Sequence, residues 1–290
     1  MRLSKKQELA LQFDRPGLRW VLASLLPILA KSSPDGVRQL SYNNGGWEHH
    51  FEGVSSVEPT PRLRGAHLRE AANLPVWGFL YTPKAGDTVV DVGAGLGDES
   101  VYFAQRVGIE GNIISIEAHP LIYGFLRRTM ELNGFKQVLA LNVAAADRSH
   151  IVSIENDLKH HLGNAILQDG GVPVQAQTLD QIVGEHNVAR IDLLKMNIEG
   201  AERLAIAGMS ATVSRTAVVA ISCHDFKWAR TGNEFFRTKA VVEEFFRDKG
   251  FVVVARDSPR AELADQVNAY NPHLIESGAL NHNGLKQYSK

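Results

Sequence analysis

The sequence is poor in cysteine, in excess charge of either sign and in long apolar runs. Its single cysteine, Cys223, excludes an intrachain disulfide and a cysteine-based zinc site, which fits the cytoplasmic location that we expect. Lys and Arg number 31 and Asp and Glu 32, so no overall charge draws the chain to nucleic acid, and we expect no such partner. The longest apolar run, residues 20–30, is about half of the roughly 20 residues that span a membrane, and we expect no transmembrane segment.

The chain also lacks internal repeats and low-complexity tracts, so its organisation has to be read from periodicity and turn signals. Residues 4–31 favour a helix, and the Asn-Gly and Pro signals of residues 41–65 predict a hairpin and an extended connector. We therefore predict an N-terminal helical and hairpin cap over residues 1–79 and a larger domain over residues 80–290.

In the larger domain, strand-like and helix-like segments alternate. The predicted strands cover residues 87–93, 111–120, 137–147, 190–197, 216–225 and 250–257, with a further one at 266–271. This alternation predicts an α/β fold with a doubly wound, mainly parallel, Rossmann-like sheet. In such sheets ligands bind beyond the carboxyl ends of the strands.

A glycine-rich loop follows the first of these strands. The stretch "DVGAGLGDES", residues 91–100, places Gly93, Ala94, Gly95 and Gly97 at a helix start, where free backbone N–H groups can approach a ligand closely. An acidic residue, Glu117, ends the next strand. Both features are typical of nucleotide-binding sites, including the dinucleotide sites of NAD-dependent oxidoreductases.

Asp91 distinguishes between these ligands. A carboxylate two residues before the first glycine would repel a pyrophosphate, whereas it would attract a sulfonium and an ammonium group. The loop therefore resembles motif I of the class I S-adenosylmethionine-dependent methyltransferases, and Glu117 resembles the carboxylate that accepts both ribose hydroxyls. A helix cap or turn role for Asp91, and a solvated strand end for Glu117, are the structural alternatives.

The ends of the third and fourth predicted strands supply further polar groups. Asn142 and Asp147 lie where this fold binds adenine, although both are also turn formers. In "IDLLKMNIEGAE", residues 191–202, alternation directs Lys195, Asn197 and Glu199 to one side, close to the expected methyl group. For Lys195, a buried ion pair with Glu199 or Asp91 is an equally good interpretation.

These motifs, taken together in this order, resemble the FkbM-type methyltransferase family over residues 80–257. The family's fourth-strand motif commonly reads Lys-x-Asp-x-Glu-Gly-x-Glu, and here Asn197 replaces the aspartate, which weakens a role as base or metal ligand. The resemblance implies S-adenosylmethionine as cofactor and O-methylation of a small-molecule or glycan acceptor, such as a sugar, glycolipid, polysaccharide or polyketide-like metabolite. Asn197 also gives weight to another hypothesis, a catalytically silent nucleotide-binding module.

A base is expected near the acceptor oxygen. His224, in "SCHD" at the end of the fifth strand, is the first candidate and Glu199 the second, while a structural histidine is the alternative. Asp225 is expected at the same edge, and a divalent metal is possible there but not required by the spacing, so no metal ligand is assigned.

The acceptor site is expected to be shaped by the cap and by the loop at residues 148–176. The pairs His49–His50 and His160–His161 would then line it, unless they are solvated loop residues. The sequence is compatible with a homo-oligomer.

Overall fold

The computed structural model describes residues 12–156, 166–167 and 170–281. At its centre is a seven-stranded sheet in the order β13-β14-β12-β11-β4-β5-β6. In that order the strands are Val252–Val254, Gln266–Tyr270, Thr216–Ser222, Ile191–Met196, Thr88–Val92, Asn112–Ile116 and Val138–Leu141. The strands from β12 to β6 run parallel, and β14 is antiparallel to both of its neighbours. The predicted doubly wound, mainly parallel α/β sheet is confirmed.

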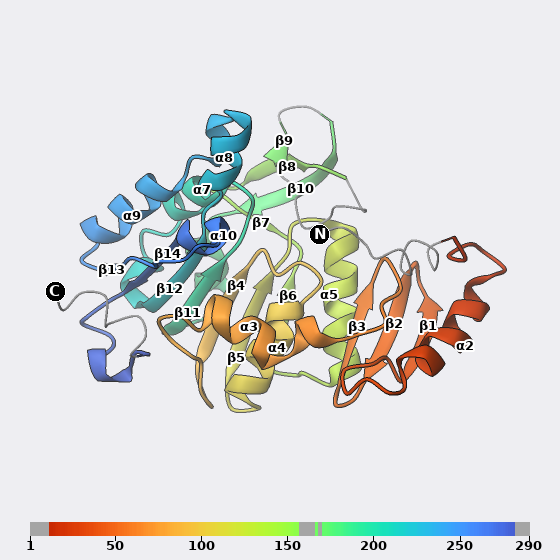
Figure 1. Cartoon of the computed structure of the whole chain (residues 1–290). Coiled ribbons are helices and arrows are strands. Elements are labelled where there is room, and N and C mark those ends of the chain that lie inside the picture. The colour runs from red at the N-terminus through yellow and green to blue at the C-terminus, as the bar shows by residue number, and fades with distance from the viewer. Residues whose placement is uncertain (1–11, 157–165, 168–169, 282–290) are drawn as a thin grey trace.

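Helices cover both faces of this sheet (Figure 1). They are α3 (Glu70–Trp77), α4 (Asp98–Val107), α5 (Pro120–Asn133), α6 (Leu179–Glu185), α7 (Glu202–Ala207), α9 (Lys239–Asp248) and α10 (Ala261–Ala264), whereas α8 (Asp225–Thr231) follows β12 and has no buried residue. Alternation along the strands separates two cores: Val90 and Leu194 pack with α6, α7 and α9, while Val89 and Leu193 pack with α3 and α4. No helix in the described ranges is long and apolar enough to cross a membrane.

The N-terminal segment forms a separate layer beside α5 (Figure 1). It contains α2 (Arg19–Ala30) and an antiparallel sheet of β1 (Gln39–Asn43), β2 (Gly46–Phe51) and β3 (Val54–Glu58), followed by a short 3₁₀ turn, Ala66–Leu68, and α3. The expected hairpin is thus extended by a third strand. The predicted helix at 4–31 is shorter in the described residues, because Pro16 and a left-handed Gly17 (φ +89°) precede its start.

A second small sheet lies where the sequence predicted the end of a strand and a loop. Residues 137–147 divide into β6 of the central sheet and β7 (Ala144–Ala145) of the small one, so the prediction of one continuous strand is wrong. The small sheet has the order β7-β10-β8-β9, with β8 at His150–Ile154, β9 at Ile166–Leu167 and β10 at Val172–Gln177. The described part of the expected loop at 148–176 is therefore largely paired, because β8 and β10 form an antiparallel ladder.

Candidate active site

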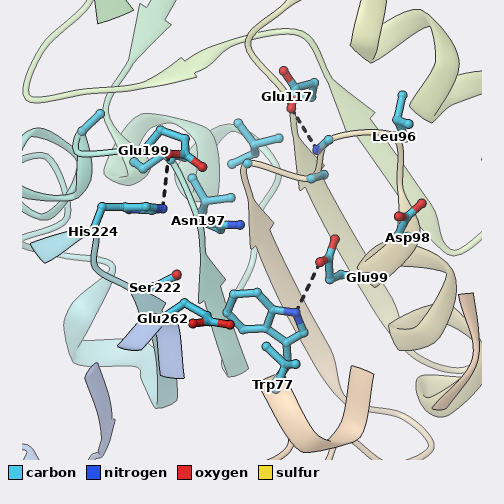
Figure 2. A pocket seen from close by; sticks show the side chains of 18 of the residues that line it. Trp77, Leu96, Asp98, Glu99, Glu117, Asn197, Glu199, Ser222, His224 and Glu262 are labelled. Carbon is cyan, nitrogen blue, oxygen red and sulfur yellow. Dashed lines mark hydrogen bonds and ion pairs between the residues drawn. The ribbon is translucent and has the colours of Figure 1, made fainter. Parts of the chain in front are cut away.

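A cavity of about 480 Å³ lies at the carboxyl ends of β4, β5, β11 and β12 (Figure 2). Among its lining residues are Gly93, Ala94 and Gly95 of the glycine loop, Glu117 after β5, Asn197 and Glu199 after β11, and His224 after β12. The topology brings these segments together because parallel strands end at one edge of the sheet. Seven of the residues expected in the site from the sequence thus share one cavity.

The glycine loop is shaped by two different constraints. Gly93 has φ +75°, and a Cβ there would lie 2.0 Å from the backbone oxygen of Asn197, so only glycine fits against β11. Gly95 has φ +55°, and a Cβ there would meet no atom within 4 Å. Since Gly95 lines the cavity, its bare backbone leaves space for a ligand. Gly97, also left-handed at φ +96°, precedes the first residue of α4 and does not line the cavity.

Glu117 is held by the backbone. One carboxylate oxygen accepts a hydrogen bond from Gly95 N–H (2.9 Å) and the other from His119 N–H (2.8 Å). Burial raises the pKa of the Glu117 carboxyl. Each oxygen keeps a further lone pair, so the group can accept from two hydroxyl donors. The adjoining wall is apolar, with Val143, Ala144 and Ile154, and this combination fits an adenosine group.

Asp91 and Lys195 form a fully buried ion pair behind the cavity. The two residues are register partners on β4 and β11, and Lys195 Nζ lies 2.7 Å from Asp91 Oδ1. Ser100 Oγ donates to the other carboxylate oxygen at 2.6 Å, and Lys195 Nζ also donates to Gly93 O at 2.9 Å. Burial disfavours the charged amine, but Asp91 and Glu99 raise the pKa of Lys195 above its usual value. Neither Asp91 nor Lys195 lines the cavity, which matches the ion-pair interpretation of Lys195.

Asn197 and Glu199 lie on the cavity wall beyond the end of β11. The Oδ1 atom of Asn197 is buried and has no hydrogen-bond partner among the described residues, whereas Figure 2 shows the amide nitrogen directed into the cavity. Glu199 adopts a left-handed backbone conformation with φ +56°. Its carboxylate accepts a hydrogen bond from Lys227 and lies 3.4 Å from Nε2 of His224. Burial opposes its charge, yet His224 and Lys227 lower the pKa of Glu199.

His224 lies between two carboxylates. Its Nδ1 is 3.1 Å from Oε1 of Glu202, and its Nε2 faces Glu199. Burial favours the neutral ring, but the hydrogen bonds to Glu199 and Glu202 outweigh it and raise the pKa of His224 to about 9. At neutral pH the ring is therefore an imidazolium. Glu202, the first residue of α7, is itself fixed by donors from Gly200 N–H and Thr238 Oγ, both at 3.1 Å.

Several residues that the sequence suggested lie outside the cavity lining. Asn142 donates to the carbonyls of Glu117 and Ala118, which makes it a local structural residue, and Asp147 pairs with Arg148. Asp225 accepts from the backbone N–H groups of Thr238 and Lys239 at the start of α9, so it turns away from His224.

The two histidine pairs have different outcomes. His49 is buried in β2, where its Nε2 accepts from Arg62 N–H, and His50 bonds Ser55. Neither lines the cavity, so this pair does not contribute to its wall. His160 and His161 lie outside the described residues.

The cavity also contains residues that the sequence argument missed. His67, Asn73 and Trp77 come from the segment that leads from the cap into α3, and Glu262 comes from α10. Their positions depend on long-range packing, which leaves no local signal in the sequence. Glu99 was detectable, because it lies in the glycine-loop motif itself. Within the described ranges, no group of three or more His, Cys, Asp or Glu residues is arranged to hold a metal ion.

Comparison with known proteins finds a curated relative of this chain. The AMB antimetabolite synthetase AmbE of Pseudomonas aeruginosa is 26% identical over 247 residues, which cover 69% of this chain and 11% of that protein. The chain thus spans about a ninth of the length of this curated relative.

Two solved structures illustrate the comparison of folds. A methyltransferase FkbM from Methylobacillus flagellatus shows 17% identity and a TM-score of 0.44, over 67% of this chain and 45% of that one. Fibrillarin from Aeropyrum pernix shows 13% identity and a TM-score of 0.43, over 80% of this chain and 98% of that one.

The sequence model of the methyltransferase FkbM domain matches residues 91–253, more than half of the 290 residues. This range begins at Asp91 and contains the glycine loop, Glu117, Asn197, Glu199 and His224. The chain therefore belongs to the FkbM family of methyltransferases.

Proposed function

We propose that this protein is an S-adenosylmethionine-dependent O-methyltransferase. One observation carries the proposal: the same cavity is lined by Glu117, a carboxylate held by backbone N–H groups, and by the ion pair of His224 with Glu199. The first end has the chemistry to bind a nucleoside, and the second has the chemistry to receive a proton from a hydroxyl. An NAD-dependent oxidoreductase is disfavoured by the family match.

The residues present fit the cofactor. Glu117 would accept from the ribose hydroxyls, Val143 and Ile154 would contact the adenine ring, and the backbone at Gly95 would lie against the ligand. When bound, S-adenosylmethionine supplies a methyl carbon that its sulfonium group has already activated. The chain's own residues then have to orient the acceptor, exclude water and take up its proton.

Asn197 and Glu199 are the side chains proposed to orient the acceptor oxygen. The carboxamide of Asn197 lines the cavity and can form a hydrogen bond with a hydroxyl group, a role that needs no negative charge. The replacement of aspartate by asparagine in the family motif is compatible with this role.

The pKa of His224 favours Glu199 as the proton acceptor at neutral pH. Because the pKa of His224 is about 9, the ring already carries its proton and is not a base in that state. We propose that the imidazolium positions Glu199, which receives the hydroxyl proton, and that Glu202 holds the ring from the other side. His224 would act as the base only in its deprotonated form.

The acceptor is proposed to be a hydroxyl of a sugar, glycolipid, polysaccharide or polyketide-like metabolite. The family resemblance supports this class, and the segment containing Asn73 and Trp77 is proposed to contact it. Residues 1–79 would then act as a cap that shapes the acceptor side, and residues 148–176 would contribute Ile154.

The test is methyl transfer from isotope-labelled S-adenosylmethionine to a panel of such hydroxyl acceptors. Glu199→Gln should lower turnover by about 100-fold or more, within the usual range for a general base, while cofactor affinity is retained. Glu185→Gln, the same change at an exposed glutamate outside the cavity lining, is the matched control and should leave turnover unchanged. Cofactor binding without transfer to any acceptor would instead support a catalytically silent binding module.

A further inference from the structure

We propose that Glu99 binds a primary ammonium group, and that this group is the amino-acid end of the cofactor. The inference rests on the proposed function and assigns a residue to a part of the ligand that Asp91 was expected to bind. Glu99 is the second residue of α4 and lines the cavity.

The groups expected to attract the ammonium are already occupied. Asp91 is fully buried, and both of its oxygens are used, one by Lys195 Nζ at 2.7 Å and one by Ser100 Oγ at 2.6 Å. Lys195 Nζ also donates a hydrogen bond to the carbonyl oxygen of Gly93. The ligand ammonium therefore needs another carboxylate.

Most other carboxylates of the cavity have partners that fix them elsewhere. Glu117 is held by two backbone N–H groups, Glu199 pairs with Lys227, and Glu262 pairs with Arg260 at 2.9 Å. Asp98 interacts with His67, at 3.9 Å. In the part of the chain that the structure describes, Glu99 is the cavity-lining glutamate with neither an ion pair nor a backbone N–H donor from another residue; only its own backbone N–H stabilises its charge in this way.

The contacts of Glu99 suit a cationic ligand. Its Oε1 accepts a long hydrogen bond of 3.4 Å from the indole N–H of Trp77, and Figure 2 shows the two side chains directed toward each other. Burial raises the pKa of the Glu99 carboxyl, and the attraction of Lys195 does not fully offset this effect. An ammonium group would supply the missing charge and a strong donor.

Binding of two ligands to two variants tests the assignment. S-adenosylhomocysteine carries the amino-acid end, whereas 5′-methylthioadenosine has the same nucleoside without it. Glu99→Gln should lower the affinity for S-adenosylhomocysteine by about tenfold or more, a typical effect of losing a charged hydrogen bond. The affinity for 5′-methylthioadenosine should change by less than about twofold. Glu99→Asp, which keeps the charge, should restore part of the affinity. Glu70→Gln, an exposed change of the same type outside the cavity, is the control.

Other outcomes would overturn the inference. Equal losses for both ligands would mean that Glu99 only supports the fold of the site. Unchanged affinity for S-adenosylhomocysteine together with reduced turnover would mean that Glu99 binds an amine of the acceptor instead. If the wild-type protein binds neither adenosyl ligand, the proposed function itself fails, and the two failures are thereby distinguished.

Discussion

At the scale of single residues, His224 links the stability of the protein to pH. Its pKa is about 9 in the folded protein against 6.5 for an ordinary histidine, so the protonated ring stabilises the fold. Because the folded pKa is raised, this stabilisation is fully present below pH 6.5 and is lost as the pH rises through about 9. A shift of this size corresponds to about 3 kcal/mol.

We therefore predict that wild type and His224→Gln diverge with pH. The free energy of unfolding of wild type, measured relative to that of the variant, should fall by about 3 kcal/mol between pH 6 and pH 10. Denaturant unfolding at several pH values measures this difference, in which groups common to both proteins cancel. A difference that stays constant with pH would show that the two carboxylates do not hold the imidazolium.

Glu117 gives a second prediction at this scale. Glu117→Ala removes the acceptor of two hydroxyl donors, and each charged hydrogen bond is worth about 1.5–3 kcal/mol. The affinity for S-adenosylhomocysteine and for 5′-methylthioadenosine should therefore fall by at least about tenfold, in contrast to the ligand-selective effect expected at Glu99. Calorimetric titration measures both ligands. Unchanged affinity would remove Glu117 from the site.

The sequence predicted which residues lie at this edge of the sheet better than it predicted which ion pairs and hydrogen bonds they form. Alternation along β11 distinguishes the side of Lys195 from that of Leu194, and the ends of parallel strands predicted a shared edge for Glu117, Asn197 and His224. The sequence left open whether Lys195 would pair with Asp91, because the register between β4 and β11 depends on long-range pairing. As a result, the sequence did not show that both carboxylate oxygens of Asp91 have partners, Lys195 and Ser100.

At the scale of elements, two glycines of one loop should respond differently to the same substitution. In Gly93→Ala the new methyl group would meet the Asn197 carbonyl, so we predict a loss of more than about 4 kcal/mol or failure to fold. In Gly95→Ala it would enter open space in the cavity, and the left-handed conformation should cost about 1–2 kcal/mol.

Thermal unfolding and titration with S-adenosylhomocysteine separate the two effects. Gly95→Ala should remain folded but bind the ligand more weakly. Gly86→Ala, at φ +86° with no atom near the new Cβ, is the control for backbone strain alone. Full ligand affinity in Gly95→Ala would show that the ligand does not approach this loop.

Long periodic elements were predictable from the sequence, and short paired ones were not. The helix after residue 120 and the buried strands β4, β5, β11 and β12 match the periodicity and the glycine at position 134. The two-residue strands β7 and β9 carry no such pattern, since only pairing with β10 and β8 makes them strands. Long-range pairing of this kind explains why the small sheet was missed.

At the scale of the whole molecule, the N-terminal layer contacts α5, a helix of the central α/β fold. The Asn133 side chain accepts from Ser55 N–H at 2.9 Å and donates to Ser55 O at 2.8 Å. Both backbone groups of Ser55 in β3 therefore have a hydrogen-bond partner on α5. Asn133→Ala would leave both backbone groups without this partner, at a cost of about 2–4 kcal/mol in the free energy of unfolding. We predict that denaturant unfolding stays a single transition, shifted by this amount. An unshifted transition would show that this contact does not join the layers.

The central claim, that the cavity binds an adenosyl cofactor, is tested most directly by calorimetric titration of the purified protein. S-adenosylmethionine, S-adenosylhomocysteine and NAD would be titrated in parallel, with and without magnesium. Our account predicts that both adenosyl ligands bind and that NAD does not. Binding of NAD alone would contradict it, because the glycine loop and Glu117 would then belong to a dinucleotide site.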